Sequence, residues 1–65
     1  MRTYILLNWQ TGDCIVVTEG YAGERTYLGP HSLGVAQSIA GRGARTDRVP
    51  AWSDAWREAV AMLDD

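Results

Sequence analysis

The stretch TYILLNWQTGDCIVVT, residues 3–18, decides the fold. β-Branched and aromatic residues, which favour strands, are frequent in 3–9 and in 14–18. The four residues between these segments form a turn signal, in which Gly12 is free to take a positive φ. A connection this short joins antiparallel strands, so we predict a β-hairpin.

A third strand and a first helix are expected after the hairpin. Residues 24–28 are predicted to form a short strand, which Gly29 and Pro30 end. Ser32 is a suitable N-cap for a helix that runs to about Ala40, and Gly41 is well placed as its C-terminal cap. Residues 42–49 are expected to form an arginine-rich loop.

The second predicted helix begins at Pro50 or Ala51 and ends at Leu63. Its apolar residues recur at helical spacing, which predicts one continuous stripe facing a core. The stripe consists of Trp52, Ala55, Trp56, Ala59, Val60 and Leu63. Ser53, Asp54, Arg57, Glu58, Ala61 and Asp65 are expected on the opposite face.

These elements predict one α+β domain over residues 1–65, with a two- to three-stranded antiparallel sheet followed by two helices packed on one face. Both faces of the hairpin are apolar, however, because Ile15 and Val17 alternate with Cys14 and Val16. A sheet covered on one side alternates apolar with polar residues. We therefore expect a dimer mate, a partner protein or loops of this chain to cover the second face.

The residue types present argue against catalysis and against a bound metal. Cys14 and His31 are the only cysteine and the only histidine, too few for an internal disulfide or a tetrahedral zinc site. The sequence does not place these two residues together, and Asp54 and Glu58 are expected on a solvent-facing helix surface. We expect a protein without enzymatic activity or cofactor. The lone cysteine and the lack of a run of about 20 apolar residues favour the cytoplasm.

Charge is unevenly distributed along the chain. Residues 42–48 hold three arginines against one aspartate, whereas residues 49–65 hold four acidic residues against one arginine. Several of these acids lie where helix stability does not favour them, at i, i+4 or at a helix C-terminus. We predict a partner-binding acidic surface that comprises Asp13, Glu19, Glu24, Asp54, Glu58, Asp64 and Asp65.

In its short length, acidic character and lack of a catalytic set, the chain resembles the anti-CRISPR proteins, small inhibitors encoded by phages. The resemblance is one of profile over the whole chain and rests on no diagnostic motif. It implies a non-catalytic inhibitor in a bacterial host cell that mimics DNA and blocks the nucleic-acid-binding groove of a CRISPR effector complex. Tyr21 or Tyr27 would then supply an aromatic anchor. The arginine-rich loop departs from a uniformly acidic mimic.

Two alternatives stay open at this point. A small nucleic-acid-binding regulator would use Arg42, Arg45 and Arg48 to contact phosphates, although the sequence pI of about 5.1 argues against direct nucleic-acid binding. A self-associating, antitoxin-like domain would instead use the second apolar sheet face to form a homodimer.

Overall fold

The computed structural model describes residues 1–63, which form four strands and two helices. In chain order these elements are β1 (Arg2–Asn8), β2 (Cys14–Glu19), β3 (Arg25–His31), α1 (Leu33–Ala40), β4 (Arg45–Val49) and α2 (Asp54–Leu63). The α+β class agrees with the prediction, and the sheet contains more strands than predicted.

The sheet is mixed, with the strand order β3-β2-β1-β4. β1 and β2 form the predicted antiparallel hairpin, in which Ile5 pairs with Val16, and β3 continues it on the other side of β2. β4 pairs with β1 in parallel, so that Leu6 lies beside Asp47. The residues predicted as an arginine-rich loop thus contain an edge strand, and charged side chains are a common feature of such edges.

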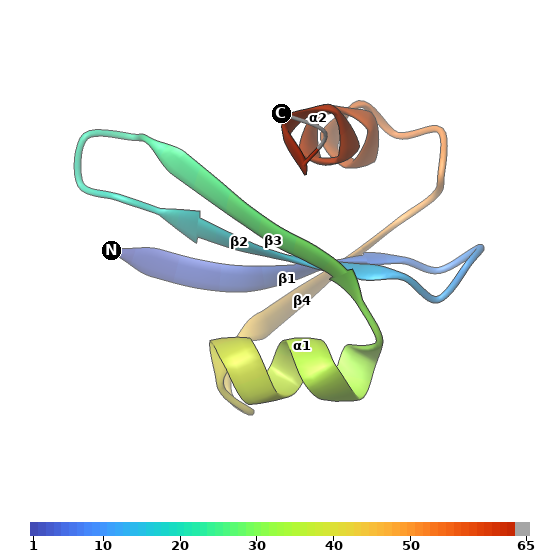
Figure 1. The fold of residues 1–65 in the computed structure, drawn as a ribbon, viewed down its shortest axis with the longest axis horizontal. Helices are drawn as coiled ribbons and strands as arrows, with labels where there is room; N and C mark the ends of the chain where they lie inside the picture. Colours follow the sequence, from blue (N-terminus) through green and yellow to red (C-terminus); the bar gives the residue numbers. More distant parts are fainter. Residues whose placement is uncertain (64–65) are drawn as a thin grey trace.

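The two helices cover opposite faces of the sheet, which corrects the prediction that both pack on one face (Figure 1). Under α2 lies a core of Leu6, Ile15, Val17, Trp56 and Ala59. Under α1 lies a second core of Ile5, Cys14, Val16 and Ala36. The second apolar face of the hairpin is therefore covered by a helix of this chain, since α1 crosses it on the way from one sheet edge to the other.

β3 extends past the predicted end of the sheet. Gly29 and Pro30 lie within the strand, and His31 pairs with Cys14 across an irregularity in the register. Gly29 has a φ of +144°, and a Cβ on this residue would lie 2.9 Å from the carbonyl oxygen of Cys14. Only glycine fits this close approach without a shift of the backbone.

The first helix has the predicted limits, and the second begins later than predicted. Ser32 caps α1 by accepting a hydrogen bond from the Val35 backbone N–H. In α2 the cap is Ser53, whose side chain accepts from the Trp56 backbone N–H at 3.1 Å. Residues 50–52 form a turn instead of a first helical turn, because Ser53 supplies the cap and the helix begins after it. Within residues 1–63, no helix combines the length and apolarity needed to cross a bilayer.

We expect Gly29→Ala to lower the free energy of unfolding by about 1–3 kcal/mol, because alanine at this φ adds backbone strain to the contact with Cys14. The matched control is Gly34→Ala in α1, where a Cβ meets nothing within 4 Å. This control should stabilise the protein by about 0.5–1 kcal/mol. Urea unfolding of both variants checks the pair, and a Gly29→Ala variant as stable as the wild type would contradict the account of β3.

Candidate functional site

The predicted acidic surface is not one cluster in the structure. Asp13 lies just before β2 and Glu24 in the turn after it, so the two are separated by the length of a six-residue strand, roughly 20 Å. Asp54 and Glu58 are exposed on α2. Asp64 and Asp65 lie outside the described residues. Among the described residues, the predicted acids therefore occupy three separate regions of the surface.

Glu19 differs from the other predicted acids because two arginines engage it. Its carboxylate accepts a hydrogen bond from Arg2 at 2.7 Å and lies 3.5 Å from the Arg25 guanidinium. Strand register explains this trio, because Arg2 and Arg25 flank Glu19 on the two neighbouring strands. Exposed ion pairs of this kind each contribute little to stability.

The three loop arginines of the prediction are also separated. Arg45 pairs with Asp47 at 3.0 Å, and its guanidinium lies 5.2 Å from the centre of the Tyr4 ring. Arg48 follows on β4 with its side chain on the opposite face, since neighbouring strand residues alternate. Arg42 is exposed in the turn before β4. Arg45 and Arg48 therefore do not share one face of β4.

Strand pairing brings Cys14 and His31 opposite each other, which the sequence did not indicate. A Cys–His pair acts as a nucleophile only when the thiolate is stabilised. Here burial, followed by the charge of Asp13, raises the pKa of the Cys14 thiol, and Cys14 is fully buried. Its environment is that of a small core residue. No group of three or more potential metal-ligating side chains occurs among residues 1–63.

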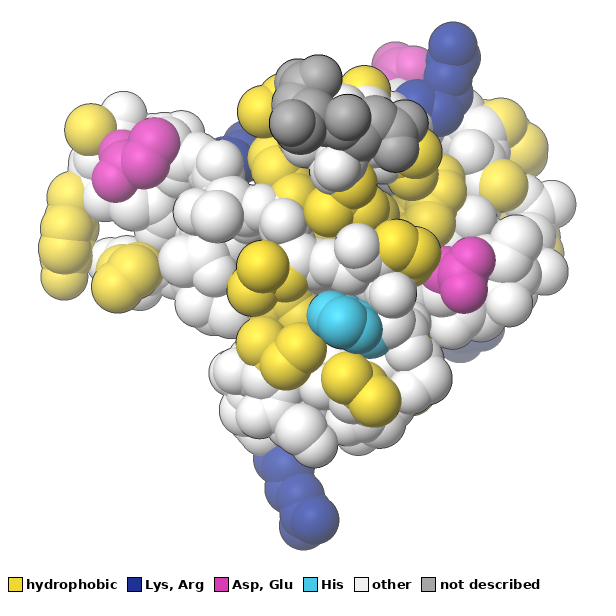
Figure 2. Space-filling model, viewed as in Figure 1, with side chains coloured by type: hydrophobic (Ala, Val, Ile, Leu, Met, Phe, Trp, Pro, Cys, Tyr) yellow, Lys and Arg dark blue, Asp and Glu magenta, His cyan; other side chains and the backbone are white. Residues whose placement is uncertain are grey.

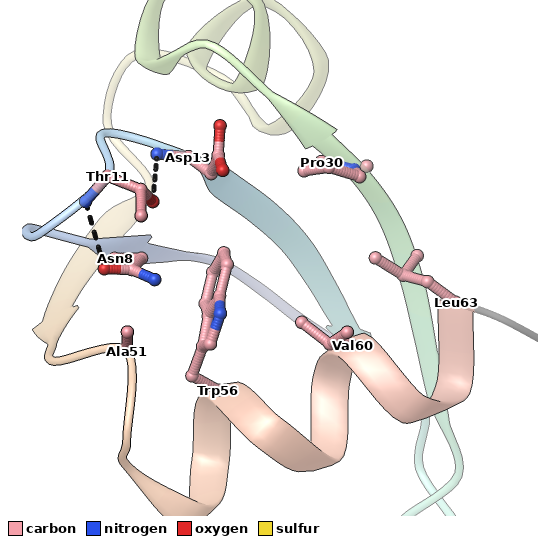
Figure 3. A pocket seen from close by; sticks show the side chains of 9 residues that line it. Asn8, Thr11, Asp13, Pro30, Ala51, Trp56, Val60 and Leu63 are labelled. Atoms are coloured by element: carbon pink, nitrogen blue, oxygen red, sulfur yellow. Dashed lines mark hydrogen bonds between the residues drawn. The ribbon is translucent and has the colours of Figure 1, made fainter.

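The most developed concave feature is a groove of about 530 Å³ beside α2 (Figure 3). It lies between α2 with the turn before it, the end of β1 with the β1–β2 turn, and the end of β3. It is lined by Asn8, Thr11, Asp13, Gly29, Pro30, Ala51, Trp56, Val60 and Leu63. A second cavity of about 430 Å³ shares Ala51, Trp56 and Val60 with it and adds Arg57 and Ala61. We refer to the first of these as the α2 groove.

Polar contacts fix the shape of the groove wall that the β1–β2 turn provides. The Asn8 side-chain oxygen accepts hydrogen bonds from the backbone N–H groups of Gln10 and Thr11, at 3.0 and 3.3 Å. The Thr11 hydroxyl accepts from the Asp13 backbone N–H at 3.3 Å. The Gln10 side-chain oxygen accepts from the Ala51 backbone N–H at 2.7 Å, which ties the turn to the segment before α2. The wall is thus held in place by the chain itself.

Large apolar side chains are exposed around this end of the molecule. Trp52, predicted to be part of the core stripe, is 73% exposed because α2 begins after it, and Trp9 is 53% exposed. In Figure 2 a band of hydrophobic side chains extends from the α2 layer towards His31, with an acidic side chain beside it. Sequence reasoning missed the groove, because its walls come from segments far apart in the chain. The one signal in the sequence was the apolar stripe of the second predicted helix, because its residues Trp56 and Val60 line the groove.

Comparison of the chain with protein-family models, with curated proteins and with solved structures gave no match.

Because burial raises the thiol pKa, we expect Cys14 to react with iodoacetamide at pH 8 at least about tenfold more slowly in the native protein than in the unfolded chain. The native rate should go on rising with pH above 9.0, the ordinary thiol value. Mass spectrometry of the alkylated protein follows both rates. Equal rates in buffer and in guanidinium chloride would show that Cys14 is not buried.

Proposed function

We propose that this chain is a non-catalytic binding domain that recognises a basic protein partner through the α2 groove, where Asp13 lies, and through exposed acidic side chains elsewhere on the surface. The observation that carries the proposal is an open groove with largely apolar walls on a domain of only 65 residues. Such a small chain needs its apolar residues for its core. Leaving this groove uncovered is thus costly unless a partner fills it.

The residues around the groove have the composition of a protein interface. Aromatic residues are enriched in such interfaces, and Trp56 lines the groove while Trp52 lies exposed just before α2. Asp13 lines the groove and forms no ion pair within the described part of the chain. A free carboxylate at an apolar groove favours a partner that supplies lysine or arginine.

We propose further that the partner handles nucleic acids, as the resemblance to anti-CRISPR proteins implies for a CRISPR effector complex. Nucleic-acid-binding proteins present clustered lysine and arginine side chains, which Asp13, Asp54 and Glu58 would meet. The separation of the acids argues for contact at a few points beside an apolar anchor. It does not favour imitation of a continuous phosphate backbone.

The test compares two arginine substitutions on α2. Val60→Arg places a long cation in the groove, whereas Met62→Arg places the same side chain on α2 outside both cavities, at a residue that is also exposed. We expect the immobilised wild type and Met62→Arg to capture a basic, nucleic-acid-binding protein from a bacterial lysate that contains a CRISPR effector complex. Val60→Arg should capture at least about tenfold less, as expected for a blocked anchor.

High salt should weaken the capture, because the contacts at the rim are ionic. Circular dichroism shows whether both variants keep the wild-type fold. Equal capture by the two variants would move the interface away from the groove. Capture of no basic protein by any of the three proteins would contradict the proposal.

A further inference from the structure

Two hydrogen-bond donors in the α2 groove have no acceptor within the described residues. Asn8 is 1% exposed, and its side-chain oxygen is used by two backbone N–H groups, which fixes the amide nitrogen as the atom on the other side. No hydrogen bond among residues 1–63 uses this nitrogen as donor, nor the indole nitrogen of Trp56. Among the described residues, no fully buried polar side-chain atom lacks a partner, so both nitrogens reach the surface.

Both donors belong to residues that line the same groove. In Figure 3 the Asn8 amide nitrogen points towards Trp56, and the indole of Trp56 stands between Asn8 and Val60. Both residues are more than nine-tenths buried, Trp56 being 8% exposed. Because both nitrogens reach the surface, water can accept their hydrogen bonds in the free protein. A ligand that offers oxygen acceptors at this point would take the place of that water.

The remaining lining residues select the kind of acceptor. Pro30, Val60 and Leu63 provide apolar contact, which suits an aliphatic side chain. Asp13 carries the negative charge at the groove, and it would repel a carboxylate ligand. A neutral carbonyl is therefore favoured as the acceptor, with a cationic group within reach of Asp13.

We propose that the α2 groove binds an extended peptide segment of the partner. Main-chain carbonyl oxygens of that segment accept from Asn8 and Trp56, an aliphatic side chain packs against Val60 and Leu63, and a neighbouring arginine or lysine pairs with Asp13. This inference rests on the proposed function and specifies the chemistry of the same groove.

The experiment is a titration of the ¹⁵N-labelled protein with the peptide acetyl-Gly-Leu-Arg-Gly-amide, followed by NMR. We expect the indole N–H signal of Trp56 and the side-chain amide signals of Asn8 to shift in a saturable way. Trp9 and Trp52 do not line the groove, so their indole signals serve as internal references and should shift less than that of Trp56. The matched peptide with glutamate in place of arginine should bind at least about threefold more weakly, because Asp13 repels it.

Three variants separate the contacts. Asp13→Asn should abolish the difference between the two peptides. Asn8→Asp keeps an oxygen for the Gln10 and Thr11 N–H groups and removes the donor, and Trp56→Phe removes the indole donor but keeps an aromatic ring. Each should weaken binding of the arginine peptide by about two- to tenfold, the range for one hydrogen bond. If Asn8→Asp does not fold, Trp56→Phe decides the same point.

Three results would overturn the inference: no shift at Trp56 and Asn8, equal shifts at all three indoles, or tighter binding of the glutamate peptide. If Val60→Arg still abolished partner capture while the peptides left Trp56 and Asn8 unmoved, the partner would use the groove by other contacts, and only this inference would fail. If the peptides bound as expected but no basic protein were captured, the peptide site would stand and the basic-partner proposal would fail.

Discussion

The burial of β2 on both faces is the constraint on which the rest of the structure depends. Cys14, Ile15, Val16 and Val17 are at most 1% exposed, so each face of this strand needs a covering layer. α1 covers one face as the chain crosses from β3 to the far edge of the sheet, where β4 pairs in parallel with β1. The last helix is then left to cover the other face. A chain of 65 residues thus builds three layers.

The groove follows from how little of α2 reaches the sheet. Only Trp56 and Ala59 are buried in this helix, with Leu63 packed beside them. The segment before the helix is held by the hydrogen bond from the Ala51 backbone N–H to Gln10 in the β1–β2 turn. The side chains at the flank of α2, Val60 among them, therefore line an opening and do not join the core. Trp56 has two roles in consequence, because it anchors the helix and also presents an indole N–H to the groove.

The sequence predicted the parts of the fold that depend on local patterns. Gly12 and the strand-forming residues around it identified the hairpin, and Ser32 and Gly41 identified the limits of α1. β4 could not be predicted, because Arg45, Asp47 and Arg48 hide its strand character and its partner lies about forty residues away. The start of α2 was placed too early, since Trp52 continues the apolar spacing although Ser53 caps the helix. The groove was missed because Asn8, Pro30 and Val60 meet only in three dimensions. The ion pairs of Glu19 were also not predicted, because strand pairing is what places Arg2 and Arg25 beside it.

The central claim is that Trp56 fastens α2 over the second sheet face and so creates the groove. Urea unfolding of Trp56→Ala and Trp52→Ala tests it most directly. Loss of a nearly buried tryptophan should cost about 3–5 kcal/mol, most of the stability available to a domain of this size. Trp52→Ala, at an exposed residue outside the helix, should stay within about 0.5 kcal/mol of the wild type. Similar losses in the two variants, or a larger loss for Trp52→Ala, would contradict the claim.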